Sequence, residues 1–465
     1  MKRKISFILF VVVLVISGDQ NLFGAALDSG DKPRNIILFI GDGMSVPQRM
    51  VAEEFSRALG GEALAMNTLP NHAMTRTYSA TSLVTDSAAA ATAIACGQKT
   101  FNGALGVDKN SNPIASSMEI AREAGKKTGL VTSVTINHAT PAGFYAHRTH
   151  RSMIYEIGLD LISSSFDLFL GGGLNKANEK TSSPEYRGNL YQLAQNAGYI
   201  VKEGRAGFDE LVDVESEKSK IWWRGCEEAL PYAIDSKSSD IPRLPELTRF
   251  ALDFLEKKSV ADGNGFFLMV EGGRIDWAGH ANEAATNLRD LLELDEAVKV
   301  ALDFQFRNPD TLIIVTGDHE TGGMSMGFAA TGYAFYMERL ASQTCSTEAF
   351  ERRYKELKKH EGVSFEDAAK LLEECYGFKF SGDEASDPMV LNSQDIESLK
   401  RHYAEGGLAD KARRIMQTKA GVGWTSSSHT GLPALTTSIG PGSEKFTGLL
   451  DNTDIAKIIK SFFVP

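Results

Sequence analysis

Short apolar runs that end at glycine or acidic residues recur along the chain and constrain its fold most strongly. Residues 35–40 are almost entirely apolar and are followed by Gly41-Asp42-Gly43, the pattern of a strand buried on both faces. Helical patterns lie between these runs, and this alternation favours a parallel sheet covered on both faces. We therefore predict an α/β fold, a three-layer α/β/α sandwich with a central, mostly parallel sheet. The other expected strands are 129–134, 166–170, 265–270, 311–315 and, as a weaker candidate, 434–439.

Acidic residues follow three of these runs closely. Asp42, Glu271 and Asp318 stand just after the apolar residues of their runs. In open α/β sheets, ligands collect beyond the carboxyl ends of the parallel strands. We therefore expect the three carboxylates to converge on one site.

Residues 330–420 differ in character from the rest of the chain. They contain segments with charged helical faces, each opened by a serine that suits a helix N-cap. We interpret about 330–420 as a helical insertion between His319 and His429. Its expected helices are 346–360, 364–375 and 393–404, and helices outside it are expected at 116–124 and 284–304.

Residues 1–25 have the pattern of a secretory signal peptide. Lys2-Arg3-Lys4 precede an apolar run that ends at Ile16, and small residues follow at Gly24-Ala25-Ala26. The apolar run is shorter than the roughly 20 residues that span a bilayer, so we expect no stable membrane anchor; a retained N-terminal anchor is the alternative. The mature chain would then be one catalytic domain, 26–465, that is periplasmic or secreted.

The charge and cysteine content argue against two kinds of site. The 465 residues carry a net charge of −11 and no cluster of Lys and Arg outside the N-terminus, so a basic face specific for nucleic acid is not expected. The cysteines form no Cys-x-x-Cys motif, which argues against a thiolate zinc site. Export permits disulfides, but four cysteines allow three pairings and the sequence does not choose among them. The four are Cys96, Cys226, Cys345 and Cys375.

Ser87 stands at the start of an alanine-rich run, 88–95, that is followed by Cys96-Gly97. Alanine favours helix most strongly and glycine commonly ends one, so Ser87 should lie at or just before a helix N-terminus. The free N–H groups and the dipole at that end favour a phosphate. A serine that only caps a buried helix is the alternative, and no Ser–His dyad is evident in the sequence.

Aspartate and histidine occur in the spacings expected of metal ligands. Asp276 and His280 are four residues apart and would share one face of a helical turn. Asp318 and His319 are adjacent at a strand end, where burial without a partner would be costly. His429 adds an imidazole in a late polar loop. Each group alone is also compatible with an exposed loop, so only their combination predicts a metal site.

Polar and basic residues follow the strand expected at 129–134. His138 and Thr140 lie in the first loop after it, and Arg151 ends a second basic segment, 146–151. A guanidinium can hold two phosphate oxygens through parallel hydrogen bonds. A solvated basic loop is the alternative for this segment taken alone.

Together these residues resemble the alkaline phosphatase family, and their order along the chain also matches. The motifs are Asp-Ser-Ala-Ala at 86–89, Val-Glu-Gly-Gly-Arg-Ile-Asp at 270–276 and Thr-Gly-Asp-His at 316–319. The similarity extends from about residue 35 to about 463 and is weakest at 330–420. The resemblance implies an exported, metal-dependent phosphomonoesterase that hydrolyses phosphate monoesters to alcohol and inorganic phosphate.

The resemblance also implies a role for each site residue. Ser87 would be the nucleophile that becomes phosphorylated, and Arg151 would hold the phosphate of the substrate. Two zinc ions, with cobalt as an alternative, and one magnesium ion would stabilise the attacking and leaving oxygens and supply the alkoxide, an arrangement for which phosphatases are the standard example. The ligands would be Asp276, His280 and His429 for one zinc, Asp42, Ser87, Asp318 and His319 for the other, and Asp42, Thr140 and Glu271 for magnesium.

His138 and Trp277 are expected beside the metal ligands, at positions where the family varies. The best-known enterobacterial enzyme has Asp and Lys there, and animal enzymes have two His; the pair in this chain is similar to a bacterial subset that favours cobalt. Tryptophan cannot ligate a metal, which leaves the metal of the third site open. The resemblance further implies small phosphate monoesters as substrates and a homodimer.

Two other functions share part of this pattern. A relative with the same two-metal core would act on phosphodiesters or sulfate esters. Sulfatases of the superfamily have Cys or Ser in a C/S-x-P-x-R context, which Ser87 lacks, and diesterases usually lack the equivalents of Thr140 and Glu271. A non-catalytic phosphate- or metal-binding protein would normally lose a nucleophile or a ligand, and none is missing here.

Overall fold

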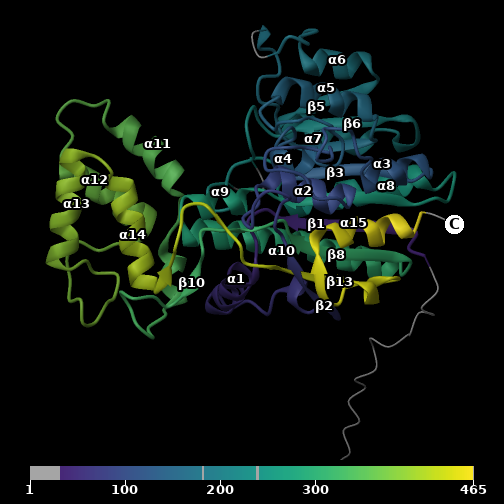
Figure 1. Cartoon of the computed structure of the whole chain (residues 1–465). Helices are drawn as coiled ribbons and strands as arrows, with labels where there is room; N and C mark the ends of the chain where they lie inside the picture. The colour runs from purple at the N-terminus through teal and green to yellow at the C-terminus, as the bar shows by residue number, and fades with distance from the viewer. Residues whose placement is uncertain (1–31, 181–182, 237–239, 464–465) are drawn as a thin grey trace, which may run out of the picture.

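A central sheet with helices on both faces forms the body of the molecule (Figure 1). The computed structural model describes residues 32–180, 183–236 and 240–463. Ten strands make the sheet, in the spatial order β14 (Gly448–Asp451), β2 (Asn71–Arg76), β13 (Ala434–Ile439), β8 (Thr311–Gly317), β1 (Asn35–Gly41), β7 (Phe266–Gly272), β3 (Lys127–Thr135), β4 (Leu168–Gly172), β6 (Lys220–Arg224) and β5 (Tyr199–Glu203). β13 is antiparallel to both its neighbours and every other pair is parallel. The predicted fold class is therefore confirmed.

Side chains of β1 alternate between two separate cores, as the two-residue period of a strand requires. Ile37 and Phe39 pack with α1 (Val46–Ala58), α8 (Leu244–Ser259) and α10 (Ala284–Arg307). Ile36 and Leu38 pack on the other face with α2 (Ser87–Cys96), α3 (Ser117–Glu123), α5 (Ile154–Ser164) and α15 (Asn452–Ser461). The sheet is thus the middle of three layers.

The expected strands and helices in this body are found, and the strands of the ten-stranded sheet that were not expected lie at its edges. β14 and β2 form one edge, and β6 and β5 form the other. These strands are short or partly exposed, so none has a long apolar run that would mark it in the sequence. The remaining helices outside residues 330–420 are α4 (Ala139–Ala142), α6 (Leu190–Asn196), α7 (Gly204–Asp209) and α9 (Arg274–His280).

Residues 347–420 form four helices that stand to one side of the sheet (Figure 1). They are α11 (Thr347–Leu357), α12 (Phe365–Tyr376), α13 (Ser393–Glu405) and α14 (Leu408–Ala420). Ser346 and Ser364 cap their helices as predicted, but the predicted cap Ser393 is wrong because the Asn392 side chain takes that place. Helix α14 was not predicted; Gly406-Gly407 precede it and no side chain caps it.

A disulfide joins Cys345, just before α11, to Cys375 near the end of α12. Cys96 and Cys226 are free thiols, so the structure contains one disulfide and none of the three arrangements in which all four cysteines pair. The predicted signal peptide, 1–25, lies outside the described residues. Among those that are described, none of the helices combines the length and the apolar character needed to cross a membrane.

Candidate active site

The carboxyl ends of the three central strands bring the predicted carboxylates together. β1 lies between β7 and β8, with Gly41 in register with both Gly272 and Gly317. Asp42, Glu271 and Asp318 therefore meet at one edge of the sheet, and all three are fully buried. Their expected convergence is confirmed.

Asp276, His280 and His429 form the first group with the geometry of a metal site. The Nε2 atoms of the two imidazoles are 3.1 Å apart, and each lies within 3.5 Å of an Asp276 carboxylate oxygen. The Nδ1 atoms donate instead to main-chain carbonyls, those of Ser427 (2.7 Å) and Thr85 (2.8 Å). Both rings therefore present Nε2 to the same point, which is how protein contacts usually orient metal-binding histidines.

His319 lies at the centre of a second group, with Asp42 and Asp318. Its Nε2 atom is 3.4 Å from Asp42 Oδ1 and 3.3 Å from Asp318 Oδ2, and Asp276 also belongs to this cluster. The Ser87 hydroxyl lies 3.1 Å from the same Nε2, a contact that was not evident in the sequence. Because the carboxylates of Asp42 and Asp318 also approach His319 Nε2, the Ser87–His319 contact belongs to a cluster of four candidate metal-binding side chains and is not an isolated Ser–His dyad.

The third group combines Asp42 and Glu271 with His138. Thr140, in the four-residue helix α4, donates to Asp42 Oδ2 at 3.2 Å, so it lies with them as predicted. His138 was expected only beside the ligands, but one of its nitrogens falls within 4.8 Å of both carboxylates. Trp277 lies farther out: its ring centre is 6.0 Å from that of His138.

Ser87 is the first residue of α2, so the prediction that it begins a helix is confirmed. The alternative in which Ser87 is the cap is wrong, because Asp86 is the N-cap and its Oδ1 accepts from the Ala89 N–H at 3.0 Å. The other Asp86 oxygen accepts from Arg151 Nη1 at 3.3 Å. Asp86 thereby ties the helix that carries the serine to the guanidinium, which also donates to His138 Nε2 at 3.2 Å.

The buried charges of this site are mutually unfavourable without a cation. Burial first, and then the neighbouring carboxylates, raise the pKa of Asp42 well above its ordinary value. Burial likewise raises the pKa of Asp318 and of Glu271 to about 8. For the imidazole of His138, burial and the charge of Arg151 lower the pKa to about 3. The site therefore collects acids that are costly to ionise and a ring that stays neutral, an arrangement that divalent cations would relieve.

Four buried side-chain atoms of a kind that can bind a metal have no hydrogen-bond partner within the described part of the chain. Asp42 Oδ1, Glu271 Oε1, Asp318 Oδ2 and His138 Nδ1 take part in no hydrogen bond. Buried polar atoms are nearly always paired in folded proteins. The mixture of imidazole and carboxylate in the first two groups fits zinc or a similar ion. The oxygen atoms of Asp42, Thr140 and Glu271 fit magnesium.

Residues that the sequence did not single out bond to the candidate metal ligands. Thr321 donates to Asp276 Oδ1 at 2.5 Å and lies 3.3 Å from His319 Nδ1. Thr132 donates to Glu271 Oε2 at 2.5 Å. Thr321 directly follows the Thr-Gly-Asp-His-Glu segment, which is the signal that could have identified it. Thr132 lies within an apolar strand, where nothing distinguishes it from a packing residue.

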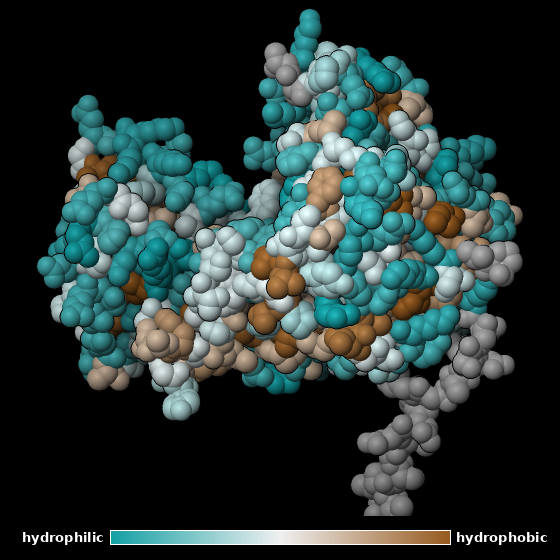
Figure 2. Space-filling view, in the orientation of Figure 1, coloured by the Kyte–Doolittle hydropathy of each residue, from teal (hydrophilic) through white to brown (hydrophobic). Residues whose placement is uncertain are grey.

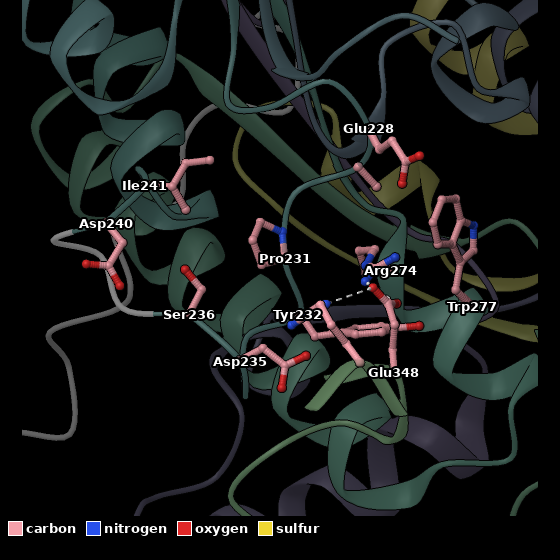
Figure 3. Close-up of a pocket in the computed structure, with 12 residues that line it drawn as sticks. Glu228, Pro231, Tyr232, Asp235, Ser236, Asp240, Ile241, Arg274, Trp277 and Glu348 are labelled. Atoms are coloured by element: carbon pink, nitrogen blue, oxygen red, sulfur yellow. Dashed lines mark hydrogen bonds and ion pairs between the residues drawn. The ribbon is translucent and has the colours of Figure 1, made fainter. Parts of the chain in front are cut away.

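A pocket of about 580 Å³ opens beside Trp277, between residues 228–236 and 240–241, α9 and α11 (Figure 3). Arg274 lies on its floor, with its guanidinium 3.5 Å from the centre of the Tyr232 ring. Its guanidinium also forms an ion pair with Glu348 of α11, 3.1 Å long. Figure 2 shows the hollow between the four helices and the main body, with hydrophilic surface over much of the helices.

Known proteins with this sequence pattern and fold are phosphatases. The alkaline phosphatase family profile matches residues 33–464. The repressible alkaline phosphatase of Saccharomyces cerevisiae is 33% identical over 437 residues, 87% of this chain and 76% of the yeast protein. The solved cold-active alkaline phosphatase of a psychrophilic Shewanella is 29% identical with a TM-score of 0.79, over 93% of this chain and all of that one. A solved histidine-to-glutamate variant of the TAB5 alkaline phosphatase has Mg bound in its M3 site. It is 26% identical to this chain with a TM-score of 0.65, over 93% of this chain and 98% of that one.

Proposed function

Because the chain belongs to the alkaline phosphatase family and is therefore a phosphomonoesterase that acts on small phosphate monoesters, we propose that it works through a phosphoserine on Ser87. The observation that carries this proposal is the position of Ser87. Its hydroxyl lies at the N-terminus of α2 and 3.1 Å from His319 Nε2, inside the cluster of metal-ligand groups.

The residues divide the reaction into two displacements. Arg151, held by Asp86, binds phosphate oxygens and turns the phosphorus towards the serine. Ser87 Oγ releases its proton to solvent and attacks phosphorus; the new Oγ–P bond forms as the bond to the alcohol oxygen breaks, and that oxygen takes a proton from water. A second water molecule then gives up a proton and attacks the phosphoserine, the Oγ–P bond breaks, Ser87 Oγ regains a proton, and inorganic phosphate leaves. Two inversions at phosphorus give retention overall.

The three groups of ligand atoms would hold two zinc ions, with cobalt as the alternative, and one magnesium ion. Asp276, His280 and His429 would hold the first zinc, Asp42, Asp318, His319 and Ser87 the second, and Asp42, Thr140 and Glu271 the magnesium. When bound, such ions lower the pKa of a hydroxyl and neutralise charge on the attacking and leaving oxygens. The position of His138 beside Asp42 and Glu271 adds a nitrogen to the third site, and a nitrogen ligand suits a transition metal better than magnesium.

Export, domain boundaries and assembly complete the proposal. We propose that residues 1–25 are a signal peptide, that 26–465 form the catalytic domain with the helical insertion at about 330–420, and that the mature enzyme is a periplasmic or secreted homodimer. The basic start and short apolar run of the N-terminus support export. The separate position of α11 to α14 beside the sheet supports an insertion.

Substitution of Ser87 tests this function. With a phosphorus-labelled aryl phosphate, the wild type should form an acid-stable phosphoprotein and Ser87→Ala should form none, with a fall in kcat of at least about 10³-fold. Thr81→Ala, at an exposed position in the preceding loop, is the matched control and should keep both the phosphoprotein and the kcat of the wild type. A phosphoprotein in Ser87→Ala would refute the assignment. Faster turnover of a bis-aryl phosphate or an aryl sulfate than of the aryl phosphate would favour the diesterase or sulfatase alternative, and tight phosphate binding without turnover would favour a binding protein.

A further inference from the structure

The insertion contacts the helix that carries Asp276 and His280 at its first residue and just after its last. Arg413, in α14, donates from Nη1 to the main-chain oxygen of Asn282 at 2.8 Å. The next residue, the buried Glu283, accepts from Gln343 Nε2 at 2.8 Å and from the Thr347 N–H at 2.7 Å. Arg274, at the start of α9, pairs with Glu348 (Figure 3). Both ends of the ligand helix are therefore held by the insertion.

Asn282 connects these contacts to His280. Its backbone is in the left-handed region, with φ of +50°, which costs energy for a residue with a side chain. Its Nδ2 donates to the main-chain oxygens of Gly279 (3.1 Å) and Ser426 (2.7 Å). The next carbonyl, that of Ser427, accepts from His280 Nδ1. A continuous series of hydrogen bonds thus runs from Arg413 through Asn282 and the 426–427 segment to the imidazole.

The ring of His280 has little else to fix its direction. It is the last residue of a seven-residue helix, and its side chain is 40% exposed, so packing restrains it weakly. The bond to Ser427 selects the tautomer in which Nε2 is the free ligand atom. If the turn at Asn282 relaxes, the carbonyl that holds this ring moves with it.

We propose that Arg413 is a positioning residue for His280, through Asn282, and that the insertion thereby sets the affinity of the Asp276–His280–His429 site for its divalent cation. This inference rests on the proposed function, since it assumes that the three side chains bind a metal. Residues that orient metal ligands from behind typically contribute 10- to 100-fold to metal affinity. Loss of the Arg413 contact should therefore weaken metal binding within that range without removing a ligand.

The chain provides a matched pair of arginines for the test. Arg413 and Arg414 both pair with Asp410, but only Arg413 reaches Asn282, and their side chains are 12% and 68% exposed. Zn²⁺ is added to metal-free protein, and its Kd is measured by competition with a chromophoric chelator. We expect the Kd of the weakest-held zinc to rise 10- to 100-fold in Arg413→Ala, to recover partly in Arg413→Lys, and to stay within twofold of wild type in Arg414→Ala.

Two further measurements separate positioning from simple loss of stability. The visible spectrum of Co²⁺-loaded protein reports ligand geometry and should change in Arg413→Ala but not in Arg414→Ala. If Arg413→Ala does not fold, Asn282→Gly serves instead: glycine accepts φ of +50° without strain, so only the side-chain bonds to the neighbouring carbonyls are lost, and the Kd should rise similarly.

The outcomes distinguish this inference from the proposed function. Equal Zn²⁺ affinity and equal Co²⁺ spectra in the two alanine variants would overturn the positioning role of Arg413 and leave the function intact. Absence of Zn²⁺ binding by the wild type itself would overturn the proposed metal site, and the inference with it.

Discussion

The Nε2 atoms of His280 and His429 face each other at 3.1 Å, while the Nδ1 atom of each ring donates to a main-chain carbonyl. In their neutral forms neither ring has a proton left on Nε2, so two lone pairs point at one another. Hydrogen bonding alone does not account for such a contact. A cation that accepts both lone pairs, with an Asp276 oxygen within 3.5 Å of each nitrogen, does account for it.

Metal removal should therefore destabilise the protein as well as stop turnover. An ion present at a thousand times its Kd contributes about 4 kcal/mol to the free energy of unfolding, and its loss leaves Asp42, Glu271 and Asp318 buried together. We expect treatment with EDTA to abolish activity and to lower Tm by several degrees, and addition of Zn²⁺ or Co²⁺ with Mg²⁺ to restore both. Protein dialysed without chelator is the control. An unchanged Tm after verified metal removal would contradict the assignment of these carboxylates as ligands.

Substitution of Thr321 should weaken metal binding although it is not a ligand. Its hydroxyl contacts both Asp276 and His319, the proposed ligands of different zinc ions. Thr321→Val keeps the shape of this buried side chain and removes only the hydroxyl. We expect a 10- to 100-fold rise in the Kd for Zn²⁺, measured by chelator competition. Thr447→Val, which removes an exposed hydroxyl bonded to the Glu444 carbonyl, should leave the Kd unchanged; equal values for both variants would show that Thr321 does not orient the ligands.

Replacement of His138 by aspartate should increase the affinity for Mg²⁺. His138 lies with Asp42 and Glu271, and Mg²⁺ prefers oxygen ligands to nitrogen. We expect His138→Asp to lower the Kd for Mg²⁺ on the order of tenfold, measured by calorimetry on zinc-loaded protein. The neighbouring His150 is exposed and bonds only to Ser152 in the described part of the chain, so His150→Asp is the control. A similar gain in both variants would mean that added charge, rather than ligation, causes the effect.

The disulfide between Cys345 and Cys375 should stabilise the insertion. It closes a loop with a sequence separation of 30 residues, for which loop-closure entropy predicts about 3–4 kcal/mol. The double variant Cys345→Ala/Cys375→Ala should therefore unfold at lower urea concentration, and dithiothreitol should shift the wild type in the same direction. Cys226→Ala removes a thiol outside the disulfide and should respond to dithiothreitol as the wild type does. No shift in the double variant would contradict a stabilising role.

The central strands and their carboxylates could be predicted because burial leaves a strong pattern. Residues 36–40 lie between two other buried strands, so every one of these positions is apolar whichever face it occupies. Edge strands such as β14 face solvent on one side and carry no such run. Ligands that follow a buried strand, such as Asp42, were therefore visible, whereas Thr132, inside a strand, was not.

The contacts around the ligands were beyond prediction because distant segments supply them through main-chain atoms. The carbonyls of Thr85 and Ser427 orient His429 and His280, and any residue type has a carbonyl. The Ser87–His319 contact joins residues 232 positions apart, so no local spacing could indicate it. The pairing of Cys345 with Cys375 depended likewise on how α11 and α12 pack.

The pair formed by His147 and Glu119 should make stability depend on pH away from the metal site. His147 Nε2 lies 2.9 Å from Glu119 Oε1, and Nδ1 lies 2.7 Å from the Gly106 carbonyl. Burial lowers the pKa of His147, but the Glu119 hydrogen bond and charge outweigh it and raise that pKa above 6.5. The pKa of Glu119 is lowered below 4.5, because its bonds to His147 and Ser116 outweigh the effect of burial.

The sign of the effect follows from these two directions. The contribution of His147 to the free energy of unfolding is complete below its unfolded pKa and is lost as pH rises through the higher folded pKa. The contribution of Glu119 is complete above its unfolded pKa and is lost as pH falls through the lower folded pKa. The pair therefore contributes most between about pH 4.5 and 6.5, by at most about 1 kcal/mol because both side chains are partly exposed. We expect His147→Ala to reduce the free energy of unfolding more at pH 6 than at pH 9, measured with urea. The metal ligands are the same in both proteins, so their own pH dependence cancels in the difference. His360→Ala, at an exposed position, should show no such pH-dependent difference, and equal losses for His147→Ala at the two pH values would rule out a charged pair.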